Sequence, residues 1–262
     1  MRFWKYHGLG NDFVLVEDHL GAVRKDPEFA RRVCDRHTGV GADGILYVGA
    51  DEEHDATMRI INSDGSEAEM CGNGIRCVAK HLHDFGLVKK RRMTIRTVVG
   101  TKTVECRIRK GAVDQVAVDM GKPTLRCEQI PMSCGGEFVS KDVEVLGTKV
   151  KGTAVSMGNP HFVTFEHFTN EQMERVGPAI SGSKLFPKRT NVEFAQKKGR
   201  KIQVRVFERG AGWTMACGTG ACATAVAAVA NGLAKENEDV EIVLPGGSLW
   251  IKVNEGLSSV IM

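Results

Sequence analysis

The sequence predicts an α+β fold of two pseudo-symmetric domains, each a curved, mainly antiparallel sheet wrapped around a central helix. Three observations support this prediction. Two stretches of the chain repeat each other, short alternating strands dominate, and each repeat ends in a glycine-rich turn that leads into a helix. An internal repeat implies two similar structural halves. Because strands do not alternate regularly with helices, we do not expect a doubly wound parallel sheet.

The repeat has two matched parts in each half. One part begins at Arg59 in the first half and at Arg205 in the second, and in both copies a cysteine follows twelve residues later. The other part lies upstream, where Asn11 precedes Cys71 by 60 residues and Asn159 precedes Cys217 by 58. These distances place equivalent features in equivalent positions of two domains.

The length of 262 residues allows two domains of about 130 residues each. We expect residues 1–117 to form the first domain, carrying Cys71, and the C-terminal strand 253–262 to join it. Residues 118–252 then form the second domain, carrying Cys217.

Short strands are predicted on either side of recurrent glycine turns. Residues 94–99, 101–108 and 112–119 alternate apolar and polar side chains, and turns at Gly100 and Lys110-Gly111 separate them. This pattern is typical of an antiparallel meander. Residues 143–155 and 192–207 show the same pattern in the second half, with Gly147 and Gly199 as turn residues.

Four helices are predicted. Asp26-Pro27 is a cap followed by a first-turn proline, which indicates a helix through Arg36, and Thr169 or Asn170 caps another through about Val176. The third follows Cys71 with apolar residues at helical spacing and ends at Gly86. The fourth follows Cys217, is composed of small apolar residues and closes at Asn231-Gly232, which predicts a helix surrounded by protein.

Composition narrows the class of protein. The formal charge is only +4, and the two basic runs, 89–92 and 197–201, lie where turns or strand starts are predicted. A basic stripe with interleaved aromatic residues, as nucleic-acid binding requires, is not present. No apolar run approaches the ~18 residues of a membrane span. No signal-peptide core follows Met1. We therefore expect a cytoplasmic protein that binds neither nucleic acid nor membrane.

The chain has eight cysteines, and we expect them to be thiols. A disulfide framework is typical of short secreted chains, whereas this chain is long enough to bury its own core. No Cys-x-x-Cys pair occurs, so a zinc site is not expected. Four cysteines have no glycine-rich turn beside them and are expected to be small buried apolar residues: Cys34, Cys106, Cys127 and Cys134.

Cys71 and Cys217 each begin a glycine-rich turn, Cys71-Gly-Asn-Gly74 and Cys217-Gly-Thr-Gly220. These two turns indicate a ligand-binding site. Glycine permits close approach of a ligand, and the N-terminus of the following helix presents N–H groups that bind a carboxylate. The same helix end favours a thiolate and so lowers a cysteine pKa. An ordinary glycine turn is the alternative for one such motif, but two in register within a repeat argue against it. Nucleotide binding is disfavoured, because neither turn carries a phosphate-binding lysine.

Polar residues flank both turns. Asn62 and Glu208 occupy equivalent positions nine residues before their cysteines, and Asn11 is equivalent to Asn159. Glu208 is suited to an ammonium group and Arg209 to a carboxylate. His161 lies in the repeated Gly-Asn motif, where it could set the protonation state of a nearby thiol.

In these motifs the chain resembles the diaminopimelate epimerase family. The resemblance covers residues 7–13, 62–77, 156–163, 189–194, 208–210 and 216–223 in order. It implies an isomerase without a cofactor, whose two domains close on a small amino-acid substrate and which acts in lysine and peptidoglycan-precursor biosynthesis. Cys71 and Cys217 would be the acid–base pair. His161 and Glu208 would tune the thiols, and the expected substrate-binding residues are Asn11, Asn62, Gly72, Asn73, Asn159, Asn191, Glu208, Arg209, Gly218 and Thr219.

One position departs from the family pattern. Trp213 stands where a glutamate is usual, which puts the substrate in question, and we expect it to pack beside the loop. The alternatives are a related racemase of another amino acid, such as histidine or a broader set, a thiol redox protein, and an amino-acid-binding protein without catalysis. The oligomeric state stays open, and a homodimer is one of the states allowed.

Overall fold

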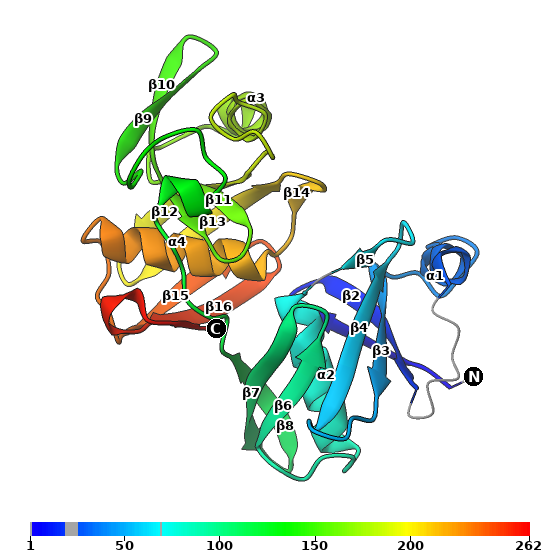
Figure 1. Ribbon diagram of the computed structural model, residues 1–262. Coiled ribbons are helices and arrows are strands. Elements are labelled where there is room, and N and C mark those ends of the chain that lie inside the picture. Colours follow the sequence, from blue (N-terminus) through cyan, green and yellow to red (C-terminus); the bar gives the residue numbers. More distant parts are fainter. Residues whose placement is uncertain (1, 19–25, 69) are drawn as a thin grey trace. The chain divides into compact units, whose positions relative to one another are not determined.

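The computed structural model describes residues 2–18, 26–68 and 70–262. The chain divides into two compact units, Met1–Asp119 and Met120–Met262. Each unit contains one mixed sheet and a long helix that the strands surround (Figure 1). The predicted α+β class with two pseudo-symmetric domains is therefore confirmed.

The sheet of the first unit has the order β1-β2-β3-β4-β6-β7-β8, and β5 pairs with β4. The predicted meander is confirmed as β6, β7 and β8. The strands are β1 (Trp4–Gly8), β2 (Asn11–Glu17), β3 (Gly44–Gly49), β4 (Ala56–Asn62), β5 (Glu67–Ala68), β6 (Arg92–Thr97), β7 (Gly100–Arg109) and β8 (Ala112–Val118).

The sheet of the second unit has the order β17-β16-β15-β13-β12-β11-β10-β9, and β14 pairs with β13. The turns at Gly147 and Gly199 have positive φ, as glycine permits, and connect hairpins. The strands are β9 (Lys141–Val145), β10 (Thr148–Ser156), β11 (Pro160–Thr164), β12 (Asn191–Lys198), β13 (Lys201–Glu208), β14 (Gly212–Thr214), β15 (Asp239–Leu244), β16 (Gly247–Val253) and β17 (Val260–Ile261).

The two sheets repeat each other in strand direction. Neighbouring strands are antiparallel except at two places in each sheet, and those places correspond. The parallel pair β2–β3 matches β11–β12, and β4–β6 matches β13–β15. The short strands β5 and β14 branch from equivalent partners. The sequence repeat therefore corresponds to a repeat of topology.

Each sheet curves around one helix. In the first unit α2 (Gly72–Asp84) packs against strands from both ends of the sheet, including β1 and β8. In the second unit α4 (Gly218–Ala230) packs on β10, β11, β12, β13, β15 and β16. The alanines of α4 before its last residue are buried on every side, because small side chains let the backbone approach the strands closely. Helix α4 ends at the predicted Asn231 cap, and α2 ends two residues before the predicted Gly86.

The two other helices cover the outer faces. Helix α1 (Pro27–Cys34) has Asp26 as its N-cap and ends two residues earlier than predicted, where the Asp35 backbone leaves the helical region. Helix α3 (Asn170–Ser181) begins with the Thr169 capping box and continues five residues past the predicted end. No helix in the described ranges is both long and apolar enough to cross a membrane.

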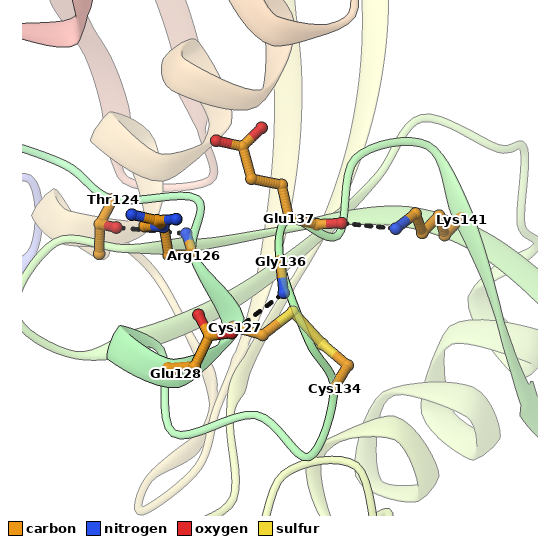
Figure 2. The surroundings of a disulfide bond; sticks show 8 residues. All are labelled: Thr124, Arg126, Cys127, Glu128, Cys134, Gly136, Glu137 and Lys141. Atoms are coloured by element: carbon orange, nitrogen blue, oxygen red, sulfur yellow. Dashed lines mark hydrogen bonds between the residues drawn. A yellow bond between two sulfur atoms is a disulfide. The ribbon is translucent and has the colours of Figure 1, made fainter.

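Two predictions about residues of the second unit are wrong. The C-terminal strand does not join the first unit: β17 pairs with β16, because its backbone groups are in register with Lys252 and Val253. In addition, Cys127 and Cys134 form a disulfide (Figure 2). A short loop brings their Cα atoms to 5.6 Å, within the range of a disulfide. The Cys127 N–H donates to the Gly136 carbonyl at 2.8 Å and closes the same loop.

Candidate active site

Cys71 and Cys217 occupy the same position relative to a helix. Each is the N-cap residue, with extended backbone, and each Sγ accepts the N–H of the glycine three residues later at 3.4 Å. The first N–H groups of a helix have no intrahelical acceptor and carry the positive end of the helix dipole. Each unit thus presents one thiol beside an anion-binding helix end, as the glycine-rich turns predicted.

Around Cys71, Asn11 is the central polar residue. Its Oδ1 accepts from the Cys71 Sγ at 3.6 Å and from the Asn73 Nδ2 at 3.2 Å. Its Nδ2 donates to the Asp43 carboxylate at 2.7 Å, and Arg36 holds the other oxygen of Asp43 at 2.8 Å. Asp43 and Arg36 therefore fix which way the Asn11 amide faces. Neither residue is among those predicted from the sequence.

The other predicted residues of the first unit are Gly72, Asn73 and Asn62. Gly72 and Asn73 form the buried first turn of α2, and Arg76 donates to the Gly72 carbonyl at 3.2 Å and to the Asn73 Oδ1 at 2.9 Å. Asn62 ends β4, where its side chain donates to Ser66 at 3.0 Å in the turn before β5.

Around Cys217 a chain of hydrogen bonds connects four predicted residues. The Cys217 Sγ lies 3.5 Å from the Thr219 hydroxyl, which accepts from the Asn159 Nδ2 at 3.3 Å. The Asn159 Oδ1 is 3.0 Å from Nε2 of His161. The histidine is fully buried and reaches the thiol through Asn159 and Thr219.

A second group gathers at the ends of β12 and β13. The Asn191 Oδ1 accepts the Arg209 backbone N–H at 2.9 Å, and the Arg209 guanidinium donates to the Lys188 carbonyl at 3.4 Å. Glu208 accepts from the Thr214 hydroxyl at 2.6 Å. Asn191, Glu208 and Arg209 are thus held near one another within the second unit.

Sequence reasoning assigned no role to Glu193, although its side chain contacts this site. Glu193 is fully buried on β12, and its Oε1 lies 2.7 Å from Nδ1 of His161. The available signal was a charged residue among the apolar residues Val192, Phe194 and Ala195, and the structure buries all of residues 191–195. A buried carboxyl without an evident partner in the sequence indicates a functional or structural pairing.

The helix end was predicted to lower the pKa of the Cys217 thiol, but the surroundings of this thiol raise its pKa. Burial raises its pKa well above the ordinary value, the charges of Glu208 and Glu193 raise it further, and the hydrogen bonds from Thr219 and Gly220 lower it by less. The helix end therefore does not produce a thiolate at Cys217 in this structure. The reason is that the loss of hydration and two acidic neighbours outweigh the donors.

The cysteines inside the two helices have a different environment. Cys77 is 5% exposed and burial raises its pKa to about 12, while Cys222 is fully buried. Both are therefore protected as thiols and unsuited to exchange with a partner in solution. Within the described residues no group of three or more His, Cys, Asp or Glu side chains is arranged to hold a metal ion.

Trp213 packs on the side of the sheet that faces α3. Its ring lies 5.9 Å from the Phe194 ring and 5.5 Å from the Phe207 ring, and its indole N–H donates to Glu174 at 2.6 Å. The Arg205 guanidinium stacks on it at 4.7 Å. These contacts are those of a packing residue.

Comparison with known proteins agrees with the family resemblance of the sequence motifs. The profile of the diaminopimelate epimerase family matches residues 3–126 and 153–262. The diaminopimelate epimerase of Desulfitobacterium hafniense is 47% identical, with 97% of this chain and 92% of the relative covered, and that of Moorella thermoacetica is 48% identical over 96% and 91%. A phenazine biosynthesis protein of the PhzF family from Bacillus anthracis shares the fold, with a TM-score of 0.67, 15% identity, and coverage of 99% and 92%.

The duplicated fold, the two cysteine-capped helices and these relatives define an isomerase of the epimerase class. Within that class the chain belongs to the diaminopimelate epimerase family.

Proposed function

We propose that this protein interconverts LL- and meso-2,6-diaminopimelate by two-base proton transfer at one α-carbon. The observation that supports this most strongly is the equivalence of Cys71 and Cys217. Each caps the central helix of its unit, and each is the only cysteine of that unit at such a position among the described residues. Two equivalent thiols suit a reaction that inverts one carbon, because one face must lose a proton and the other must gain one.

In the proposed reaction a thiolate removes the α-proton while the opposing thiol donates a proton to the other face. The reverse direction exchanges their roles. The C–H bond breaks, the electron pair remains on the α-carbon and its carboxylate, and the new C–H bond forms from the second sulfur. The N–H groups at the starts of α2 and α4 offset the negative charge that develops on the carboxylate. The chemistry requires no cofactor.

The binding roles follow from the chemistry of each group. Gly72, Asn73, Gly218 and Thr219 lie in the first turns of the helices and would bind the reacting carboxylate. Glu208 and Arg209 carry charges opposite to the ammonium and carboxylate of the substrate. The complete set proposed to bind the rest of the substrate is Asn11, Asn62, Asn159, Asn191, Glu208 and Arg209, with His161 and Glu208 tuning the thiols.

The same proposal assigns the protein to a biosynthetic pathway and to a cellular compartment. A diaminopimelate epimerase acts on a small diffusible amino acid in the synthesis of lysine and of peptidoglycan precursors. We propose a cytoplasmic enzyme, and a homodimer is the assembly that we would test first, by light scattering of the purified protein.

The test is isotope exchange in D₂O with LL- and meso-diaminopimelate, followed by NMR at the α-carbons. An epimerase incorporates deuterium at the α-position and interconverts the two isomers, whereas a redox protein or a binding protein incorporates none. A panel including L-histidine tests the alternative racemase. If the enzyme exchanges histidine with a higher kcat/KM than diaminopimelate, the substrate assignment is wrong and the two-cysteine mechanism survives.

A further inference from the structure

A buried acid–base pair in the second unit has no equivalent in the first. Glu193 and His161 are fully buried and lie 2.7 Å apart. The parallel register pairs His161 with Asn191 in one unit and Phe13 with Gly44 in the other. Counting along these strands, Phe13 is the counterpart of His161 and Leu46 is the counterpart of Glu193. An apolar pair in one unit is therefore an ionisable pair in the other.

The position of Glu193 beneath the helix end is equally specific. A Cβ added at Gly220 would lie 2.8 Å from the Glu193 Oε1 and 3.3 Å from the Cys217 Sγ. A Cβ added at Gly74 would likewise lie 2.9 Å from the Leu46 side chain and 3.7 Å from the Cys71 Sγ. The carboxyl and the thiol thus both lie against one glycine in the first turn of α4.

The hydrogen-bond donors of this pair have one consistent arrangement. One proton is shared between Glu193 and the His161 Nδ1, and whichever group holds it, Nε2 carries a second proton that it donates to the Asn159 Oδ1. The Asn159 amide then donates through Nδ2 to Thr219, whose hydroxyl lies against the Cys217 sulfur. The other oxygen of Glu193, Oε2, is buried without a hydrogen-bond partner among the described residues.

We infer that Glu193 is a positioning residue for Cys217: it fixes the His161–Asn159–Thr219 chain and keeps the proton on the Cys217 thiol while Cys71 serves as the base. This inference rests on the proposed function, because it assigns the thiol and the thiolate that the two-base reaction requires. The first unit has Leu46 and Phe13 in place of the pair, so no such charge lies beneath Cys71.

The charges around Cys217 agree with this assignment. Two ionisable groups act on it directly, Glu193 on β12 and Glu208 on β13, and both carboxylates raise the pKa of its thiol. His161 on β11 reaches the thiol only through Asn159 and Thr219. The buried positions of β10, β15 and β16, which also pack on α4, hold no ionisable side chain. Burial raises the pKa of Glu193 itself, and the contact with His161 opposes that shift.

The test is the variant Glu193→Gln, examined by alkylation without substrate. Purified protein is treated with iodoacetamide across a pH series, and peptide mass spectrometry follows Cys217 and Cys71 separately. Glutamine keeps the shape of the side chain and donates to the Nδ1 of a neutral His161, so the variant loses both charges of the Glu193–His161 ion pair. The lost carboxylate lies beside Gly220 and the thiol, whereas the lost imidazolium reaches the thiol only through Asn159 and Thr219, so the loss of the nearer, negative charge dominates. We expect the midpoint of Cys217 alkylation to fall by about one pH unit, which makes alkylation below the midpoint about tenfold faster. The Cys71 midpoint should not move.

Activity gives a second measurement. If Cys217 must be protonated for turnover, the alkaline limb of the pH dependence of kcat/KM should move to lower pH in Glu193→Gln. A double variant, His161→Phe with Glu193→Leu, installs the apolar pair of the first unit and should lower the Cys217 midpoint in the same direction. Glu144→Gln, an exposed carboxylate on β9, is the matched control and should change neither quantity.

The double variant decides the question if Glu193→Gln fails to fold. An unchanged Cys217 midpoint in the folded variants, with a fall in kcat/KM that parallels a lower melting temperature, would show a purely structural role and overturn the inference. Failure of the proposed function is seen separately, because wild-type protein would then incorporate no deuterium from D₂O while the alkylation result still stands.

Discussion

At the scale of the residue, each cysteine has a role that a neighbouring cysteine cannot supply. Cys71 and Cys217 cap their helices, whereas Cys77 and Cys222 are buried inside them. We expect Cys71→Ala and Cys217→Ala each to lower kcat/KM for epimerisation by about 10²–10⁴-fold or more, because one face of the carbon loses its proton carrier. Cys34→Ala, in α1, is the control and should retain activity. Normal turnover in either active-site variant would falsify the two-base mechanism.

Trp213 carries a second prediction at this scale. Its ring contacts Phe194 and Phe207 and lies under the Arg205 guanidinium, which is a packing role, and a glutamate there would lie beside Glu174. We expect Trp213→Glu to destabilise the protein by about 1–3 kcal/mol while leaving the ratio of kcat/KM for meso-diaminopimelate and L-histidine unchanged.

Urea unfolding and the two kinetic assays measure the effects of this substitution. Trp213→Phe keeps an aromatic ring and should lose less stability. A change of roughly tenfold or more in the substrate ratio would instead show that Trp213 helps to select the substrate.

At the scale of the element, the loop before β9 is closed by the Cys127–Cys134 disulfide (Figure 2). Cys127 is fully buried in the core cluster that includes Ile130, Phe138 and Phe162, so the loop is anchored to the second unit. Within the loop the Gly136 N–H donates to Glu128 at 3.0 Å.

We expect Cys134→Ser to lower the free energy of unfolding by about 2–3 kcal/mol under oxidising conditions, because the short cross-link no longer restricts the unfolded chain. The comparison in dithiothreitol is the control: reduction of the wild-type disulfide should bring the two proteins to the same stability. A difference that persists in full after reduction would show that the serine acts through packing and not through the cross-link.

At the scale of the whole molecule, the proposed two-base mechanism makes a prediction that involves both units. If both thiols act on one α-carbon, they must come close together during turnover. Mild oxidation should then join Cys71 to Cys217 and abolish activity, and a thiol reductant should restore it. Peptide mapping under non-reducing conditions identifies the bridge. A dominant Cys71–Cys77 bridge would mean that the two thiols do not meet.

The sequence by itself determined the features that depend on local spacing. The starts of α2 and α4, with a cysteine as each N-cap, follow from glycine turns and helical periodicity, because capping and amphipathicity involve residues within a few positions of one another. The hairpin turns at Gly147 and Gly199 follow similarly from glycine at positive φ. The repeat of these local features was sufficient to predict two similar units.

Only the tertiary structure decided which distant groups meet. The Glu193–His161 pair joins residues 32 positions apart, and it depends on the parallel register of β11 and β12, which no local pattern specifies. The same is true of β17, whose partner is β16, and of Trp213, whose indole reaches Glu174 on α3. The raised pKa of Cys217 has the same origin, because burial and neighbouring charges exist only once the strands have packed around α4.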